Sequence, residues 1–215
     1  MNKKDPISIA LILAMLGIAA YIYPSMPDSI ATHWNAVGEV DAYSSKAVGL
    51  FAIPALTAVV YLLFLAIPKI DVFKDNIMSF IGYYDNFKLL FVAFMLIVYS
   101  STILQNMGYK FGLNTVLIPA VAVLFYYLGH IMPHMRRNFF IGIRTPWTLA
   151  NEKVWNKVHN IGGKTFRLNA AVILLSLAVP SYSIWVLLAS ILLNALYLIA
   201  YSYLLYQKEG RNELQ

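Results

Sequence analysis

The sequence predicts an all-α membrane protein with six transmembrane helices and both termini in the cytoplasm. Hydrophobic residues make up 60% of its 215 residues and charged residues only 12%, whereas a typical soluble domain contains about 25% charged residues. The apolar residues gather in runs close to the roughly 20 residues that a helix needs to cross a bilayer. A chain of this length has room for one helical bundle without a separate soluble domain.

The first two predicted spans flank a polar loop, residues 24–46. Residues 7–23 form a long apolar run that lacks a clean small-x-small cleavage motif before Pro24. We therefore interpret this run as a retained transmembrane helix rather than a signal peptide. The second span is predicted at residues 47–67, and Pro68 is expected to close it.

The rest of the chain contains four more apolar runs. A mixed-charge segment, residues 69–88, precedes the first of them, and we expect a short interfacial helix in it around residues 77–84. The four runs predict spans at residues 89–104, 113–132, 165–179 and 184–206.

Lys and Arg are distributed unevenly over the predicted connections. Of the 16 such residues, 14 fall at the termini, in segment 69–88 and in the loop 133–167, while only Lys46 and Lys110 fall elsewhere. Because Lys-rich and Arg-rich loops of membrane proteins stay in the cytoplasm, this asymmetry predicts that both termini and the loop 133–167 are cytoplasmic. The loop 24–46 then faces the outside.

The basic loop, residues 133–167, is the longest polar segment of the chain. It contains seven Lys and Arg residues and a single acidic residue. Pro146 predicts a rigid turn, and Asn151 is a suitable N-cap for a helix. We expect a short amphipathic helix at residues 152–160 that lies on the membrane surface and ends at the glycine pair 162–163. The charge of this loop suits an acidic protein surface or anionic phospholipid.

A set of polar, aromatic and glycine residues follows a fixed order along the basic loop. The set is Asn138, Gly142, Arg144, Thr145, Pro146, Trp147, Thr148, Trp155, His159, Gly162 and Gly163. In this order and spacing it closely resembles the signature of the SdpI/YfhL family of bacterial toxin-immunity membrane proteins.

A second resemblance lies in the outer loop. It is carried by Pro27, Asp28, Ile30, His33, Trp34, Asn35, Gly38, Asp41 and Lys46. These residues look like the N-terminal module that is often joined to the SdpI region, although Ala31 and Ala42 stand where the pattern more often has Pro and Gly. We therefore divide the chain into a membrane module at residues 1–110 and an SdpI-like membrane region at residues 111–215.

The resemblance implies an integral protein of the bacterial cell membrane that protects the cell from a secreted antibacterial peptide toxin. In the characterised system it also implies a receptor that holds a cytoplasmic transcriptional repressor at the membrane. It implies no catalysis, no cofactor and no direct binding of nucleic acid. For the toxin-binding or sensing site we single out an aromatic and polar cluster of the outer loop. Its members are His33, Trp34, Asn35, Asp41 and Tyr43.

The residues also leave two alternatives open. One is a metal-dependent membrane enzyme that uses His130, His134 and His159, although Pro133 interrupts the helix between the first two and no metalloprotease glutamate lies there. The other is a lipid-associated or envelope-associated protein in which the basic loop binds phospholipid. Under any of these interpretations, Trp147 and Trp155 are expected to be interfacial anchors rather than binding residues.

A coupled transporter is disfavoured by the placement of the acidic residues, which all fall in predicted loops or at predicted helix ends. Ion pathways usually contain carboxylates within the spans. The polar residues expected within or near the ends of spans are Asn114, Asn169 and Asn194, and such side chains more often join helices by hydrogen bonds.

Overall fold

Six long helices dominate the computed structural model, which describes residues 3–212. Each of the six is long and apolar enough to cross a membrane, which confirms the prediction of a six-span, all-α membrane protein. They are α1 (Asp5–Ile22), α2 (Lys46–Ile70), α4 (Ile81–Asn106), α5 (Leu113–Ile131), α7 (Glu152–Leu175) and α8 (Ser183–Asn212).

The connections contain a β-hairpin and several short helices. The strands are β1 (Ser29–Trp34) and β2 (Val40–Ser45), and the short helices include α3 (Lys74–Ser79) and α6 (Pro146–Ala150). The remaining short elements are the 3-10 turns η1 (Tyr23–Ser25), η2 (Met132–His134), η3 (Ser176–Ala178) and η4 (Pro180–Tyr182).

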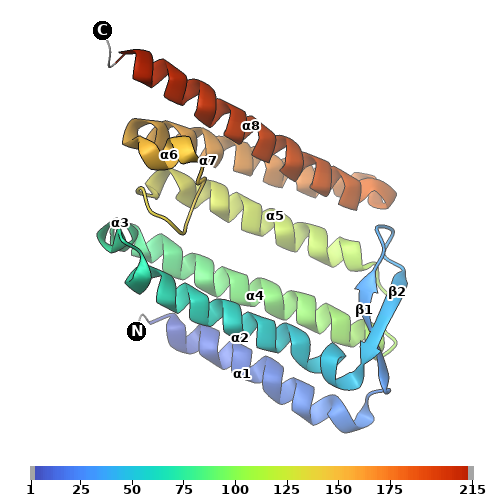
Figure 1. Cartoon of the computed structure of the whole chain (residues 1–215). Helices are drawn as coiled ribbons and strands as arrows, with labels where there is room; N and C mark the ends of the chain where they lie inside the picture. Colours follow the sequence, from blue (N-terminus) through green and yellow to red (C-terminus); the bar gives the residue numbers. More distant parts are fainter. Residues whose placement is uncertain (1–2, 213–215) are drawn as a thin grey trace.

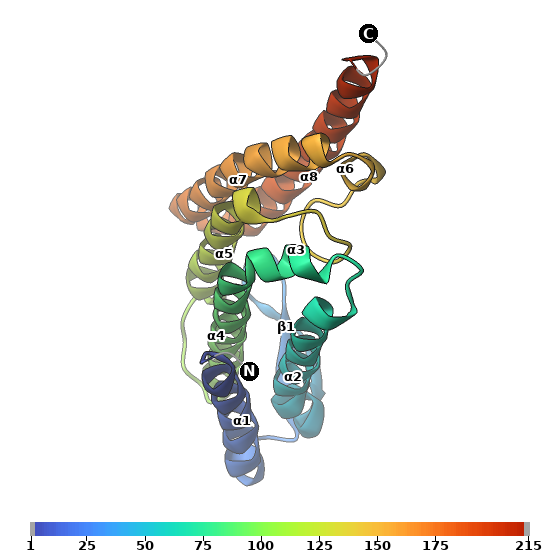
Figure 2. The same cartoon turned by 90° about the vertical axis from the view of Figure 1, so that its left-hand side faces the viewer.

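The helices run up and down between two ends of the molecule (Figure 1). One end, called here the terminal end, carries the first residues of α1, the last residues of α8, and α3 and α6. The opposite end, called the hairpin end, carries β1 and β2. Helices α1, α2 and α4 pack on one another, α5 and α8 pack on α7, and contacts between α4 and α5 join the two groups. The two views of Figures 1 and 2 agree on this order.

The hairpin was not predicted, because residues 24–46 were described only as a polar loop. Its strands pair antiparallel with an irregularity near Thr32, and Ile30 of β1 is fully buried. A Cβ at Gly49 would lie 2.4 Å from the side chain of Ile30, so glycine in α2 lets the strand lie directly on the helix. The Asn106 side chain fixes the same strand, since it hydrogen bonds both the N–H and the C=O of Ala31 at 2.8 and 3.0 Å.

Pro68 does not end the second span as predicted, because α2 continues to Ile70. Proline at this position has no N–H for the carbonyl oxygen four residues earlier, that of Phe64. The hydroxyl of Tyr84 supplies the missing donor, at 3.0 Å from Phe64 O. A side chain of α4 thus compensates for the proline.

Two predicted boundaries in the segment 69–88 were also wrong. Helix α4 begins at Ile81 rather than at residue 89, and the separate short helix covers only Lys74–Ser79. As a result, Asp85 and Lys88 lie inside a long helix and are buried, as is Asp5 of α1. The Lys88 ammonium lies 2.8 Å from a carboxylate oxygen of each aspartate. The chain therefore contains a buried ionic cluster among its spans that the sequence analysis did not foresee.

The glycine pair 162–163 does not end a helix. Helix α7 runs without interruption from Glu152 to Leu175, and neither glycine has a positive φ. The predicted surface helix is instead the first part of this span, with Val154 and Val158 fully buried. Glycine is needed at both positions because a Cβ at Gly162 would collide with Ile143 and Met132, and a Cβ at Gly163 with Gly129 and Pro133.

Cysteine labelling tests the predicted orientation, since the chain contains no native cysteine. A cysteine at Ser44, in the hairpin, is expected to react with an impermeant maleimide added to intact cells, whereas one at Ala150, at the terminal end, is expected to react only after lysis. Labelling of Ala150→Cys but not Ser44→Cys in intact cells would mean that the protein has the opposite orientation.

Candidate functional site

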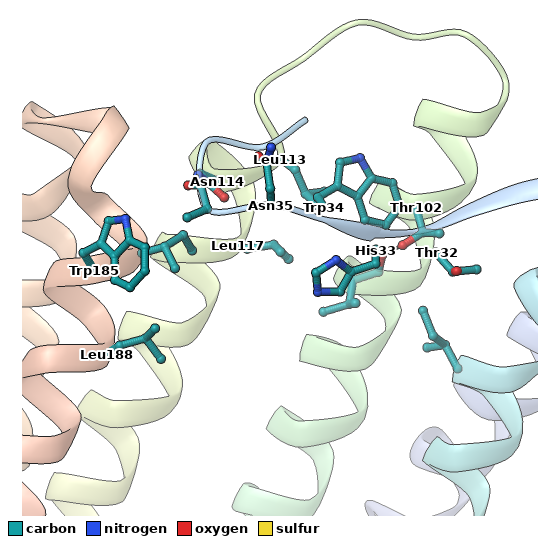
Figure 3. A pocket seen from close by; sticks show the side chains of 14 residues that line it. Thr32, His33, Trp34, Asn35, Thr102, Leu113, Asn114, Leu117, Trp185 and Leu188 are labelled. Atoms are coloured by element: carbon teal, nitrogen blue, oxygen red, sulfur yellow. Dashed lines mark hydrogen bonds between the residues drawn. The ribbon is translucent and has the colours of Figure 1, made fainter. Parts of the chain in front are cut away.

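A pocket of about 410 Å³ lies under the hairpin. We call it the hairpin pocket. Residues 32–36 of β1 and the following turn form one side of it, and the first residues of α5 and α8 form another. Figure 3 shows β1 crossing over the pocket, with Trp185 and Leu188 of α8 on the far side from His33. Its apolar lining side chains include Ile53, Val98, Leu117, Ile184, Trp185 and Leu188.

Three of the five residues predicted for toxin binding line this pocket: His33, Trp34 and Asn35. Asp41 is not in the lining, but its carboxylate lies 2.5 Å from His33 Nδ1 and holds the imidazole against β2. Tyr43 is 64% exposed on β2 and stands apart from the pocket.

Asparagine side chains set the shape of the turn that borders the pocket. The Asn35 Oδ1 atom accepts hydrogen bonds from the N–H groups of Val37 and Glu39, and Gly38 supplies the positive φ of 87° that this turn needs. Asn114 of α5 donates from Nδ2 to Ala36 O at 3.1 Å. The hairpin of the first half of the chain is therefore fastened to a helix of the second half.

The half of the pocket that α5 and α8 provide was not predicted from the sequence. Leu117, Trp185 and Leu188 belong to predicted spans, where apolar residues carry no distinguishing signal. Only Trp185 offered a cue, because a tryptophan near the end of a span is typical of the membrane interface. The pocket combines apolar walls with a polar border, which suits an amphipathic ligand.

The signature residues of the basic loop meet at the terminal end, where they fix the backbone. Asn138 is fully buried. Its Oδ1 accepts from the N–H groups of Phe140 and Ile141, and its Nδ2 donates to the carbonyl oxygens of Arg136 and Ile141. One asparagine therefore organises the tight turn that begins the signature.

His159 and Gly142 are fitted to each other. The imidazole Nε2 accepts a hydrogen bond from the N–H of Ile143 at 3.0 Å, and Nδ1 lies 2.8 Å from Trp155 O. This pattern of one acceptor and one donor is that of a neutral imidazole. A Cβ on Gly142 would lie 2.4 Å from His159 Nε2, and the backbone φ of Gly142 is 113°. Only glycine therefore allows the loop to approach the ring.

The second part of the signature is a helix start. Thr145 and Thr148 form a capping box for α6, with Pro146 at its first turn. The Thr145 hydroxyl also lies 3.0 Å from Ser202 Oγ of α8. Arg144 donates to Phe139 O at 2.6 Å, so its guanidinium holds the shape of the loop.

The two signature tryptophans have different surroundings. Trp147 packs edge-on against Tyr203 with ring centroids 5.1 Å apart, as expected for a side chain near the interface. Trp155 is fully buried, donates from Nε1 to Met135 O at 2.8 Å, and stacks on His159. The expectation that Trp155 is an interfacial anchor was therefore wrong, because the helix predicted to lie on the membrane surface is the first part of the span α7.

The three histidines of the metal hypothesis are not brought together. The rings of His130 and His134 are 6.1 Å apart, but both nitrogens of His159 are used by the backbone contacts described above. No group of three or more His, Cys, Asp or Glu residues suited to a metal ion occurs within residues 3–212.

The three asparagines of the spans behave differently from one another. Asn169 of α7 donates to Ser190 O of α8, which confirms the expected bond between helices. Asn114 of α5 hydrogen bonds the hairpin turn rather than another span. Asn194 is 8% exposed and makes no side-chain hydrogen bond within the described part of the chain.

Fold and site together define a multi-pass cell-membrane protein with a pocket at one end and a tightly hydrogen-bonded basic loop at the other. Residues 134–202 match the SdpI/YfhL protein family, and residues 10–58 match DUF1648, a domain of unknown function. The chain is 27% identical over 207 residues, 96% of its own length and 97% of the relative's, to "Immunity protein SdpI" of Bacillus subtilis (strain 168). These findings confirm the resemblance of residues 134–202 to the SdpI/YfhL family. No solved structure gives a significant match.

Proposed function

We propose that this protein is an immunity protein that protects the cell from a secreted antibacterial peptide toxin by binding the peptide in the hairpin pocket. The likeness to an immunity protein covers nearly the whole of both chains. The observation that carries the choice of site is the pocket itself, because it joins apolar walls from four helices to a polar border from β1.

The chemistry of the pocket suits a short segment of an amphipathic peptide. Its volume of about 410 Å³ falls in the range of about 300–1,000 Å³ that is typical of small-ligand sites, so it can hold a few side chains rather than a whole peptide. Apolar side chains would bury against Leu117, Trp185 and Leu188. Polar groups of the peptide would meet His33 and Asn35, which lie at the end of the spans where headgroups are expected.

Filling the pocket is expected to abolish protection. Leu117→Trp places a larger side chain in the lining, while Leu193→Trp makes the same change at a residue of α8 that is 66% exposed and outside the lining. A toxin-sensitive bacterium that expresses the wild type or Leu193→Trp should survive a challenge with the family's peptide toxin. Leu117→Trp at the same membrane abundance should protect at least about tenfold less, as the loss of about 1.4 kcal/mol of binding would produce.

Two results would contradict this proposal. Equal protection by Leu117→Trp and the wild type would remove the hairpin pocket from the mechanism while leaving immunity in place. Failure of the wild type to protect, with the protein present in the membrane, would reject immunity to that peptide.

We propose a receptor function at the terminal end as the second part of this role. Lys153 and Lys164 are exposed there, and Arg136 makes no ion pair within residues 3–212. A basic surface of this kind attracts an acidic protein such as a transcriptional repressor. In the same cells, a fluorescent fusion of the repressor should move to the membrane when the peptide is added. If it stays in the cytoplasm, the receptor part is wrong.

A further inference from the structure

A second polar pocket lies at the terminal end, away from the hairpin. Its volume is about 380 Å³, and it lies between the end of α3, the beginning of α4, η2 and α7. We call it the His134 pocket. The polar side chains that line it are those of Ser79, Tyr83, His134, Arg136, Asn156 and Asn160.

The polar groups of this pocket are rich in hydrogen-bond donors. The lining residues carry a guanidinium, an imidazole, two carboxamides and two hydroxyls, and none of the described residues that line the pocket is Asp or Glu. The side chains of His134, Arg136 and Asn156 make no hydrogen bond or ion pair within residues 3–212. They are therefore available to a ligand, and an acceptor suits them because the arginine can only donate and no carboxylate lines the pocket.

Aromatic stacking holds one of these donors in place. The His134 ring lies parallel to Tyr83, with ring centroids 4.3 Å apart and 10° between the planes. The His130 ring packs edge-on against it. A fixed imidazole beside a free guanidinium matches a phosphate, which arginine binds through two parallel hydrogen bonds.

The position of the pocket indicates that the phosphate belongs to a lipid headgroup. Tyr83 and Tyr127 surround His130 at the end of α5, and tyrosines at such a level are typical of the headgroup region of a bilayer. The terminal end is the predicted cytoplasmic end, where anionic phospholipids are enriched. We propose that the His134 pocket binds the phosphate of an anionic phospholipid headgroup, with Arg136 and His134 as its main contacts.

Native mass spectrometry of the full-length protein in detergent tests this assignment. The probes are dioctanoyl phosphatidylglycerol, dioctanoylglycerol, which has the same chains without the phosphate, and inorganic phosphate. The wild type should retain phosphatidylglycerol and release dioctanoylglycerol. Arg136→Gln should weaken phosphatidylglycerol binding by about twentyfold, because a charge-assisted, bidentate contact is lost.

Two further variants separate a specific site from general attraction. Lys153→Gln removes the same charge from the terminal end outside the His134 pocket, and should weaken binding about fivefold at most. His134→Phe keeps a ring on Tyr83 but removes the nitrogens, and should weaken binding severalfold without loss of folded protein in gel filtration.

Three outcomes would overturn the proposal. Equal losses for Arg136→Gln and Lys153→Gln would mean general attraction only. Equal retention of dioctanoylglycerol would mean that the acyl chains, not the phosphate, are recognised. Displacement of the lipid by equimolar inorganic phosphate would assign the pocket to free phosphate and reject the lipid. None of these outcomes bears on the hairpin pocket or on toxin protection.

Discussion

Replacing Lys88 with methionine is expected to lower the free energy of unfolding by about 3–5 kcal/mol, the range measured when one partner of a buried ion pair is removed. The Lys88 ammonium lies 2.8 Å from Asp5 Oδ1 and 2.8 Å from Asp85 Oδ1, and all three side chains are at most 6% exposed. Tyr61 of α2 also donates to Asp5 Oδ1 at 2.9 Å. Without the ammonium, two buried carboxylates lose their shared cation, and α4 loses its ion pair with α1.

Thermal unfolding of the purified protein in detergent, followed by loss of helical circular dichroism, measures this effect. Lys46→Met is the matched control, because Lys46 pairs with Asp28, whose side chain is fully exposed, and exposed pairs contribute about 0–1 kcal/mol. Equal midpoints for Lys88→Met and Lys46→Met would show that the buried cluster does not stabilise the fold.

A partial rescue identifies the cause of the loss. Combining Lys88→Met with Asp5→Asn and Asp85→Asn removes both uncompensated charges and should restore much of the stability. If the triple variant is as unstable as Lys88→Met, then packing of the long Lys88 side chain, rather than its charge, accounts for the effect.

The number and order of the spans could be predicted because they depend on properties that are local in sequence. Runs of apolar residues of the required length define each helix, and α1 and α5 end within about two residues of their predicted positions. The helix start at Asn151 was also predictable, since its side chain accepts from the N–H groups of Lys153 and Val154. The predicted cap needed no tertiary contact.

The boundaries that failed depend on partners far away in sequence. Pro68 is accommodated only because Tyr84 lies beside Phe64, and the early start of α4 buries Asp85 and Lys88 only because Asp5 faces them. A single sequence does not show these pairings. Charged residues therefore suggested a loop where the structure has a helix.

The candidate site was predictable only in part. His33, Trp34 and Asn35 stand out in a polar loop, so their selection rested on their residue types and their family pattern. The pocket that they border was not predictable, because Leu117, Trp185 and Leu188 are ordinary apolar residues of spans. Only the packing of α5 and α8 beneath the hairpin places them together.

The second large effect is expected for Gly163→Leu, which should lower the free energy of unfolding by about 1–3 kcal/mol or more, as overpacking does. A Cβ on Gly163 would lie 2.9 Å from Gly129 O and 2.9 Å from the Pro133 ring. A Cβ on Gly129 would in turn lie 2.8 Å from Gly163 O. The backbones of α5 and α7 therefore touch at this crossing, as small residues allow in membrane helix pairs.

The variant Gly163→Ala distinguishes packing from helix propensity, because the two have opposite effects on the free energy of unfolding at this position. Alanine in a helix interior is favoured over glycine by about 1 kcal/mol, so Gly17→Ala in α1, where a Cβ meets no atom within 4 Å, should leave the unfolding midpoint unchanged or raise it. Gly163→Ala should lower the midpoint, because its Cβ collides with the backbone of α5. A rise for both variants would show that α5 and α7 can move apart without cost. A fall for Gly163→Ala alone would mean that Gly163 serves the contact between two spans, and that its place in the family signature reflects the packing of α7 on α5.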